Sequence, residues 1–342
     1  MATVAVEQTT SEANEANKTA DHARYRVSVA EYRSFAREGY LIVRGLVPPE
    51  DVAAFIAHTD DVLAGREPLP GAPHVIQGWS AEEAEKAFNR TFMPHLHHPL
   101  HERFLLHERV LDVLEALIGP DVMAMQSMLF LKSPGSPGQG YHQDAYYIPT
   151  RPDTLCGAWI ALDPADEENG CLWMTRGSQF EPVYPDTQKI GQNHAPDALN
   201  GLTLIHGASD PDETANGLTP IAAQFVGQEV PVTVEPGDVV FFQGHILHRS
   251  HHNASANRYR RSFVGHYANA RSYTEWHGGN GEHILARGDT HLPFATPRFG
   301  TPCAALRTAE ERAAGATRML VADGDMMGSE EMGDAQRGPT TH

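Results

Sequence analysis

The amino-acid sequence predicts a mainly β fold with flanking α-helices, built on a double-stranded β-helix of the jelly-roll, cupin-like kind. Short apolar runs alternate with turn signals over residues 122–268, which is typical of a double-sheet barrel. Helical patterns with start signals precede this region. The chain has 342 residues, of which 41% are hydrophobic, so it can bury one large core.

Three helices and one strand are expected before the β region. Residues 28–31 have the Ser-x-x-Glu spacing of a capping box, which predicts a helix start. Residues 40–43 form a short apolar run typical of a buried strand. A second helix opens at Pro48, and the apolar spacing of residues 102–118 predicts a third. Residues 66–100 are rich in loop signals.

Six apolar runs are predicted to be core strands because turn residues bound each of them. They cover residues 122–132, 156–162, 171–174, 230–234, 239–242 and 260–268. Residues 180–228 interrupt this series and are rich in Pro, Asn, Gly and Asp. A long excursion of this kind is expected to be a lid or a peripheral insertion.

One principal domain is expected over residues 25–305, with its β core at about 122–268. Residues 1–24 offer almost nothing to bury and are predicted to form a disordered N-terminal tail. Residues 306–342 pass from a helix-forming run into an acidic segment, which predicts a helical to disordered C-terminal tail. Residues 278–300 either cover the mouth of a site or pack on the outside.

The charge balance excludes some classes of function. A net charge of -18 and no Lys/Arg-rich run argue against nucleic-acid binding. No run approaches the roughly 20 apolar residues of a membrane span, and the N-terminus lacks signal-peptide features. The three cysteines are too few and scattered for a disulfide framework. A cytoplasmic protein of undetermined oligomeric state, acting on a small molecule, is expected.

His142 and Asp144 are the first candidate metal ligands. They lie one residue apart in a run that reads as a strand, where alternate side chains share a face. A distant histidine would complete a 2-His-1-carboxylate facial triad, which leaves open positions on iron. The downstream stretch 244–253 offers four such histidines, and spacing alone does not choose among them: His245, His248, His251 and His252.

Two other histidine patterns are expected not to bind metal. His58 and Asp60 repeat the His-x-Asp spacing on a predicted helix, where i and i+2 point about 200° apart. A second group contains His95, His97, His98 and His101. His97 and His101 have the spacing of a helical zinc pair, but His98 stands where a metalloprotease needs glutamate. This group is predicted to be a solvated loop entering a helix.

Several segments match one family in the same order over roughly residues 30–268. They are residues 35–46, 132–135, 141–144, 159–163 with 168–170, and a His-x-Ser-x-x-Asn element at His248, Ser250 and Asn253 followed by Arg260 and Arg261. In these segments the chain resembles the phytanoyl-CoA dioxygenase family of Fe(II)- and 2-oxoglutarate-dependent oxygenases. It departs from the family at residues 176–179, Arg-Gly-Ser-Gln, where Pro-Gly-Ser-His is common, and this leaves the substrate in doubt.

The resemblance implies a ligand set. It selects His248 as the third metal ligand beside His142 and Asp144, with Fe(II) as the metal. It aligns Arg260 with the arginine that binds the far carboxylate of 2-oxoglutarate, and Ser250 with a serine that donates to the same group. An arginine suits this task because its planar fork pairs bidentately with a carboxylate. Arg258 and Arg261 remain alternatives, and Lys132 and Trp159 are expected around the cosubstrate.

The resemblance also implies a reaction. With O2, and with ascorbate as an in vitro reductant, such an enzyme hydroxylates an unactivated C–H bond and releases succinate and CO2. The carboxylate of Asp144 favours hydroxylation over halogenation, because related halogenases have a small residue in its place. Three alternatives stay open: desaturation or ring formation by the same family, a zinc hydrolase using the same ligands, and a non-catalytic metal-binding jelly roll.

Overall fold

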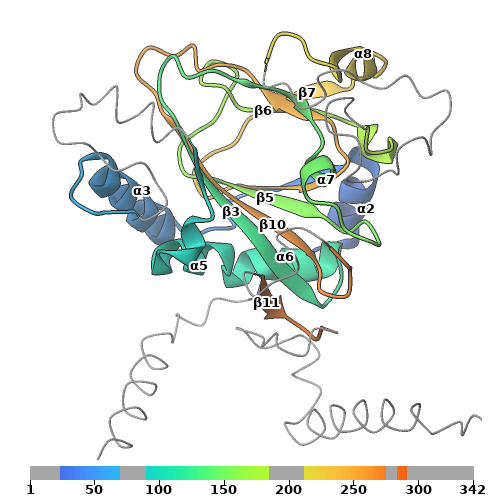
Figure 1. Ribbon diagram of the computed structural model, residues 1–342, viewed down its shortest axis with the longest axis horizontal. Coiled ribbons are helices and arrows are strands. Elements are labelled where there is room, and N and C mark those ends of the chain that lie inside the picture. The colour runs from blue at the N-terminus through green and yellow to red at the C-terminus, as the bar shows by residue number, and fades with distance from the viewer. Residues whose placement is uncertain (1–23, 70–89, 185–211, 275–282, 291–342) are drawn as a thin grey trace, which may run out of the picture.

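Two antiparallel β-sheets face each other in the computed structural model, which describes residues 24–69, 90–184, 212–274 and 283–290 (Figure 1). The larger sheet has the strand order β1-β8-β5-β10-β3-β11, with β2 also paired to β3. The smaller sheet has the order β4-β9-β6-β7. This double-sheet arrangement with few helices confirms the predicted jelly-roll class.

The larger sheet contains most of the predicted core strands. Its members are β1 (Tyr40–Val43), β2 (Arg90–Phe92), β3 (Val122–Lys132), β5 (Cys156–Ala161), β8 (Val239–Gln243), β10 (Arg260–Asn269) and β11 (Ile284–Arg287). The short strand β2 lies in the region that was predicted to be rich in loops, and it was not expected there. It pairs with the middle of β3. A strand of only three residues is too short to show an alternating apolar pattern in the sequence.

The smaller sheet brings distant parts of the chain together. It consists of β4 (Gln139–His142), β6 (Leu172–Thr175), β7 (Glu229–Val232) and β9 (His248–Ser250). Strands β4 and β9 are antiparallel, and His142 and His248 are cross-strand partners. The fold therefore places two of the predicted metal ligands side by side.

The first predicted helix begins where its capping box indicated. Helix α2 (Val29–Glu38) starts with a complete capping box between Ser28 and Glu31 and ends at Gly39, whose φ of 84° is left-handed. Helix α3 (Pro49–Leu63) carries proline in its first turn, as predicted.

The third predicted helix is two helices, which corrects the expected continuous span. Helix α5 (Pro99–Leu105) and helix α6 (Glu108–Leu117) are separated at His107, whose ψ of 121° is not helical. The break changes the direction of the chain, so that Phe104 in α5 and Leu111 in α6 are both fully buried. A single straight helix would bury one apolar stripe along its length, whereas the two helices of this region each bury an apolar face.

Helices α3, α5 and α6 cover the side of the larger sheet that faces away from the smaller sheet (Figure 1). Their contact with the sheet is aromatic: the Phe55 ring lies 4.3 Å from Phe104 and 5.4 Å from Phe263, centroid to centroid. All three side chains are fully buried. Burial of this kind contributes about 1.5–3 kcal/mol per side chain, so this layer is a main source of stability.

Strand β10 has two faces with different tasks. Alternation puts Arg261 and Phe263 toward the helices, and Arg260, Val264 and His266 toward the space between the sheets. Arg261 pairs with Asp163 and with Asp60 of α3 on the outer side. The inner face thereby becomes one wall of a cavity.

The segment after β10 packs on the outside. Strand β11 extends the larger sheet beyond β3, and Arg287 at its end pairs with Asp112 and Glu115 of α6. Of the two possibilities left open for residues 278–300, the described part therefore fits packing on the outside. Both expected tails lie outside the described residues, except Arg24, which pairs with the same two carboxylates.

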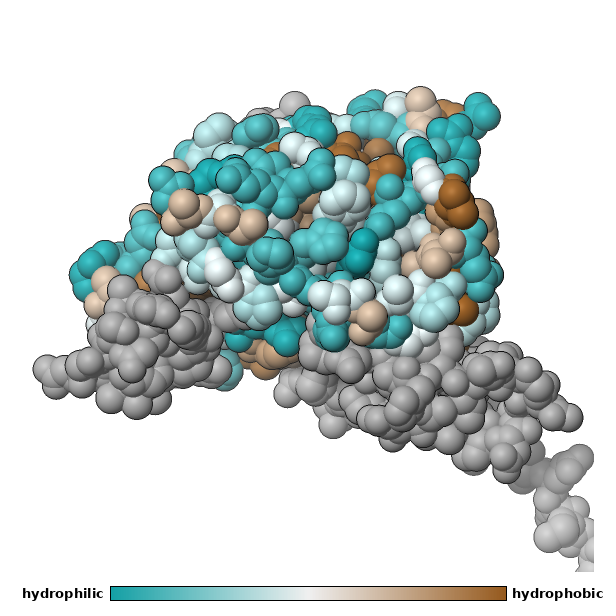
Figure 2. All heavy atoms as spheres, turned by 90° about the horizontal axis from the view of Figure 1, so that it is seen from above, coloured by the Kyte–Doolittle hydropathy of each residue, from teal (hydrophilic) through white to brown (hydrophobic). Residues whose placement is uncertain are grey.

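The expected lid over residues 180–228 is described only in part, because residues 185–211 lie outside the described ranges. At its end, helix α8 (Thr219–Ala222) and Leu218 pack against Tyr141 and Leu247. The surface on this side of the molecule is mostly hydrophilic (Figure 2). Among the described helices, none is both long and apolar enough for a bilayer.

Candidate active site

A cavity of about 610 Å³ lies between the two sheets. The inner face of the larger sheet lines it through alternate residues of β3, with Gln126, Met128, Phe130 and Lys132 all contributing. The smaller sheet contributes the opposite wall through strands β4, β6 and β9. All seven predicted site residues line this one cavity: Lys132, His142, Asp144, Trp159, His248, Ser250 and Arg260.

The side chains of His142, Asp144 and His248 converge and could hold a metal ion, with one ligand atom of each within 4.8 Å of the others. Asp144 Oδ1 lies 3.7 Å from His142 Nε2 and 3.8 Å from His248 Nε2. One detail of the expectation is wrong: β4 ends at His142, and Asp144 begins the short helix α7 (Asp144–Tyr147). Gln143 between them is still extended, with φ -122° and ψ 123°, so alternation puts both side chains on one side.

Both histidine rings are oriented by their own backbone. His142 Nδ1 lies 2.9 Å from the carbonyl oxygen of Gly140, and His248 Nδ1 lies 3.0 Å from that of Ile246. A carbonyl only accepts, so each Nδ1 carries the proton and each Nε2 presents a lone pair. This is the tautomer that a metal ligand needs. His142 Nε2 lies 3.2 Å from the Gln139 side-chain nitrogen.

Asp144 is held ionised by its surroundings. Burial alone would raise its pKa, but His266, with His248 and His142, outweighs burial and lowers the pKa well below the usual range. His266 Nε2 donates to Asp144 Oδ2 over 2.9 Å, and Oδ1 is left facing the two histidines. Burial lowers the pKa of His142 to about 3, so this ring is neutral. Two imidazoles and one carboxylate are a donor set that suits Fe(II).

Arg260 is a buried cation inside the cavity wall. Its guanidinium lies 5.6 Å from the Trp159 ring centroid, its Nε donates to the Gly170 carbonyl, and its Nη1 donates to Ser262. It forms no ion pair with any carboxylate of the described residues. Burial lowers its pKa to about 10, and it therefore stays charged at neutral pH. A buried charge without a counter-ion is costly, so this position favours an anionic ligand.

The acidic turn before β6 holds Arg260 in place. Gly170 has a φ of +81°, and a Cβ there would lie 2.5 Å from the His251 carbonyl oxygen, which requires glycine. Asn169 shapes the turn, because its amide donates to the Pro164 and Tyr259 carbonyls. The carbonyl of Gly170 is consequently aimed at the guanidinium.

Lys132 is a second buried basic side chain beside Arg260. The two residues are cross-strand partners of β3 and β10. The Lys132 ammonium donates to the Ser250 hydroxyl over 3.2 Å and to the His251 carbonyl. Burial, followed by the charge of Arg260, lowers its pKa to about 6. Within the described part of the chain it too has no carboxylate in ion-pair contact.

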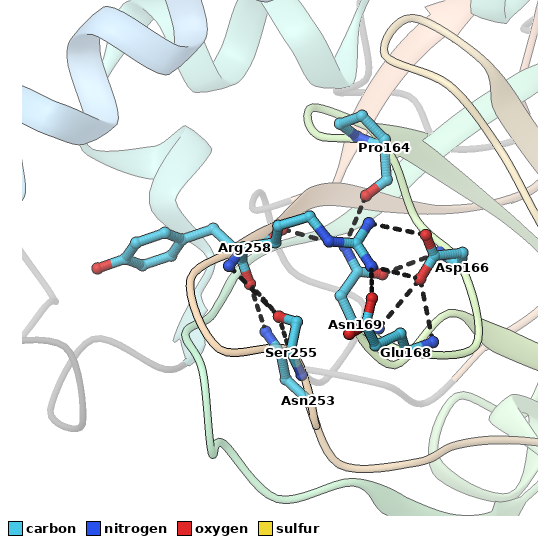
Figure 3. A network of polar contacts seen from close by, with 8 residues as sticks. Pro164, Asp166, Glu168, Asn169, Asn253, Ser255 and Arg258 are labelled. Carbon is cyan, nitrogen blue, oxygen red and sulfur yellow. Dashed lines mark hydrogen bonds and ion pairs between the residues drawn. The ribbon is translucent and has the colours of Figure 1, made fainter.

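Neither alternative arginine is in the cavity lining. Figure 3 shows Arg258 in a surface network, where its guanidinium pairs with Asp166 and Glu168. Its carbonyl accepts from Asn253 and Ser255 in the same network (Figure 3). Arg261 faces the helices, as described above. Of the three arginines, only Arg260 combines a position in the cavity wall with the absence of a carboxylate partner in the described residues.

The remaining histidines of the 244–253 stretch have other neighbours. His245 lies 3.4 Å from Asp153, His251 packs edge-on against Trp173, and His252 pairs with Glu213. The altered residue Gln179 donates to the Ala36 and Arg37 carbonyls at the end of α2, away from the cavity lining. This departure therefore does not bear directly on the pocket.

The upstream histidines correct an expectation. His95 and His101 are buried rather than solvated, at 3% and 0% exposure, and His58 is buried beside His101. Asp60, two residues from His58 on the same helix, pairs with Arg261. His58 instead meets His98 and His101 in a separate cluster that could hold a metal ion.

Sequence reasoning missed His266. The residue lies on β10, six positions after Arg260, and strand alternation could have placed both on the inner face. That inference also needs the sheet pairing of β10 with β3, which carries a register shift between His266 and Tyr267. A single sequence contains no direct signal for this irregularity.

The family model described as phytanoyl-CoA dioxygenase (PhyH) matches residues 35–262, which include every residue of the triad. The chain belongs to the phytanoyl-CoA dioxygenase family. A relative in this family, the probable phytanoyl-CoA dioxygenase of Caenorhabditis elegans, is 28% identical over 257 residues, covering 71% of this chain and 76% of the relative.

Solved structures share the fold. The non-heme alpha ketoglutarate dependent carbocyclase SnoK from nogalamycin biosynthesis matches with a TM-score of 0.52 and 20% identity, over 75% of this chain and 88% of SnoK. EctD from S. alaskensis, solved with 2-oxoglutarate and 5-hydroxyectoine, matches with a TM-score of 0.52 and 19% identity. The match covers 74% of this chain and 86% of EctD. At these sequence identities, the similarity to SnoK and EctD shows a shared fold.

Proposed function

We propose that this protein is an Fe(II)- and 2-oxoglutarate-dependent dioxygenase that hydroxylates an unactivated C–H bond of a small-molecule metabolite. The observation that carries this proposal is the pairing, in one cavity, of a His/Asp/His cluster with two buried basic side chains, Arg260 and Lys132, that have no carboxylate partner in the described residues. A metal-chelating dianion supplies the missing charge. The keto acid 2-oxoglutarate is such a dianion.

His142, Asp144 and His248 would hold the iron, and Arg260, Lys132 and Ser250 would bind the far carboxylate of the cosubstrate. When bound, Fe(II) and 2-oxoglutarate use O2 to oxidise a C–H bond, with release of succinate and CO2. Trp159 shields the Arg260 guanidinium, and His266 keeps Asp144 ionised and turned toward the histidines. These residues bind and orient; the hard chemistry belongs to the metal and the cosubstrate.

The cavity wall indicates the kind of substrate. Met128, Phe130 and Phe242 give it an apolar surface, and Gln126 and Gln139 add amides that fix orientation. A volume of about 610 Å³ suits a small free metabolite that shares the space with 2-oxoglutarate. The same cavity also suits ring formation or desaturation, and product analysis distinguishes these outcomes.

The test needs no known substrate. Anaerobic protein is mixed with Fe(II) and 2-oxoglutarate, and the visible charge-transfer absorption of a chelated keto acid is recorded. Wild type should show the band, His142→Ala and His248→Ala should lose it, and the matched surface variant His252→Gln should keep it. Succinate formation under air with ascorbate then measures turnover. A band that survives His248→Ala, turnover that survives Asp144→Ala, or turnover that continues without O2 contradicts the proposal.

A further inference from the structure

A second cluster of histidines lies on the outer side of the larger sheet, apart from the cavity. His58 belongs to α3, His98 caps the start of α5, and His101 lies inside α5. One nitrogen of each ring lies within 4.8 Å of the others. The Nε2 atoms of His58 and His101 are only 2.9 Å apart. Three imidazoles from two helices thus converge on one point.

Glu67 holds two of these rings. Its Oε2 lies 2.8 Å from His58 Nδ1, and its Oε1 lies 2.9 Å from His98 Nε2. A carboxylate on the far nitrogen of an imidazole fixes the tautomer and leaves the near nitrogen as a lone pair. Metal-ligating histidines commonly have this partner. Glu67 therefore aims the His58 Nε2 lone pair at His101.

Burial keeps two of the rings neutral, while one side of the cluster remains open. His58 and His101 are 5% and 0% exposed, and burial lowers the pKa of both, that of His101 to about 2. The side chains of His98 and Glu67 are 19% and 38% exposed, which leaves a route for an ion. Among the described residues His101 Nδ1 has no hydrogen-bond partner, whereas its Nε2 contacts His58.

We propose that His58, His98 and His101 form a structural metal site for Zn(II), with Glu67 as the supporting carboxylate. Three imidazoles suit this borderline ion, and tetrahedral geometry leaves a fourth position for water or Glu67. The ion would replace the contact between the His58 and His101 nitrogens. His98 must then release one contact, Nε2 with Glu67 or Nδ1 with the Leu100 amide, and its partial exposure gives it room.

The site would join α3 to the start of α5 over the aromatic layer. The His101 ring lies 4.8 Å from Phe55 and 6.0 Å from Phe263, centroid to centroid. Phe263 points outward from β10, whereas Arg260 and His266 of the same strand point into the cavity. The ion would therefore stabilise the helix layer and take no part in the oxygenase chemistry. The inference stands independently of the proposed function.

The first experiment uses a variant that lacks two of the candidate metal ligands in the cavity, so that the cavity does not compete for Zn(II). Full-length protein with His142→Ala and His248→Ala is freed of metal and titrated with Zn(II) against a chromophoric chelator. One equivalent should bind, and thermal unfolding should shift to higher temperature on loading. Adding His98→Gln should abolish both effects, and adding Glu67→Gln should weaken binding 10–100-fold. The neighbouring exposed residue gives a matched control, since His97→Gln should change neither.

A second measurement uses wild-type protein, so the result does not depend on the folding of the double variant. The His98→Gln variant should bind one Zn(II) ion fewer per protein than wild type, while its Fe(II)–2-oxoglutarate absorption stays unchanged. Co(II) at the site should show the intense absorption of tetrahedral coordination. Equal Zn(II) affinity with and without His98→Gln, or no stoichiometric binding by the double variant, overturns the metal site and leaves a hydrogen-bonded histidine network.

Discussion

His266 Nε2 lies 2.9 Å from Asp144 Oδ2 and links the inner face of β10 to the residue that begins α7. The contact is buried, and it leaves Asp144 Oδ1 as the oxygen that faces His142 and His248. In effect, one histidine that does not approach the candidate metal position decides which carboxylate oxygen is offered there.

Replacing His266 by leucine should weaken Fe(II) binding 10–100-fold, the usual cost of losing the partner of a metal ligand. The reason is that Asp144 Oδ2 loses its donor and the carboxylate is free to rotate. Anaerobic Fe(II) titration measures the effect. His266→Gln, which keeps a donor, should recover most of the affinity, and the exposed control His252→Leu should bind iron normally. Equal affinity in His266→Leu and wild type rules out this positioning role.

Replacing Arg260 by lysine should weaken 2-oxoglutarate binding without affecting Fe(II). Hydrogen bonds to a charged group contribute about 1.5–3 kcal/mol, which corresponds to a factor of roughly 10 to 150 in affinity. Calorimetric titration of the anaerobic iron form gives the dissociation constant. Arg258→Lys is the matched control and should leave the constant within about twofold. A larger effect at Arg258 than at Arg260 would move the assignment to the surface arginine.

Binding of 2-oxoglutarate should take up a proton at pH 8. Lys132 is mostly neutral there, because burial and then Arg260 lower its pKa to about 6. A bound carboxylate favours the charged ammonium and raises that pKa, so affinity should fall as pH rises above about 6. Calorimetry in two buffers of different ionisation enthalpy counts the proton. Lys132→Met should bind more weakly and show no uptake; unchanged uptake in that variant would exclude Lys132 as the source.

Replacing Arg287 by methionine should lower the free energy of unfolding by about 3 kcal/mol. Removing one partner of a buried ion pair costs about 3–5 kcal/mol, and the lower end applies because Arg24 still contacts Asp112 and Glu115. Urea denaturation with a fixed m-value measures the change. The exposed pair of Arg37 with Glu38 gives the control, since Arg37→Met should shift stability by under about 0.5 kcal/mol. Equal effects would mean that β11 adds little to the fold.

Local patterns were enough to predict much of the fold and the candidate ligands. The capping box at Ser28 and the strand beginning at Val122 depend on neighbouring residues, and both are present where expected. Whether His142 and Asp144 share a face depends only on the extended backbone of Gln143. That expectation survived although the strand itself ends at His142.

What could not be predicted depends on contacts between distant segments. The burial of His101 results from α5 packing on β10, and His95 is buried against Ser127 of β3, whereas sequence spacing alone suggested solvated side chains. The partnership of His266 with Asp144 spans 122 residues. The choice of Arg260 over Arg258 rests on which strand face meets the cavity and which residue already has carboxylates nearby.

Both histidines of the triad place their Nδ1 against the carbonyl oxygen of the residue two positions earlier in the chain. Their tautomers therefore do not depend on which residues line the cavity. Side chains such as Gln126, Met128 and Phe130 can be exchanged without releasing either imidazole. Point substitutions in the cavity wall can therefore change which substrate fits, while the candidate metal ligands keep their orientation.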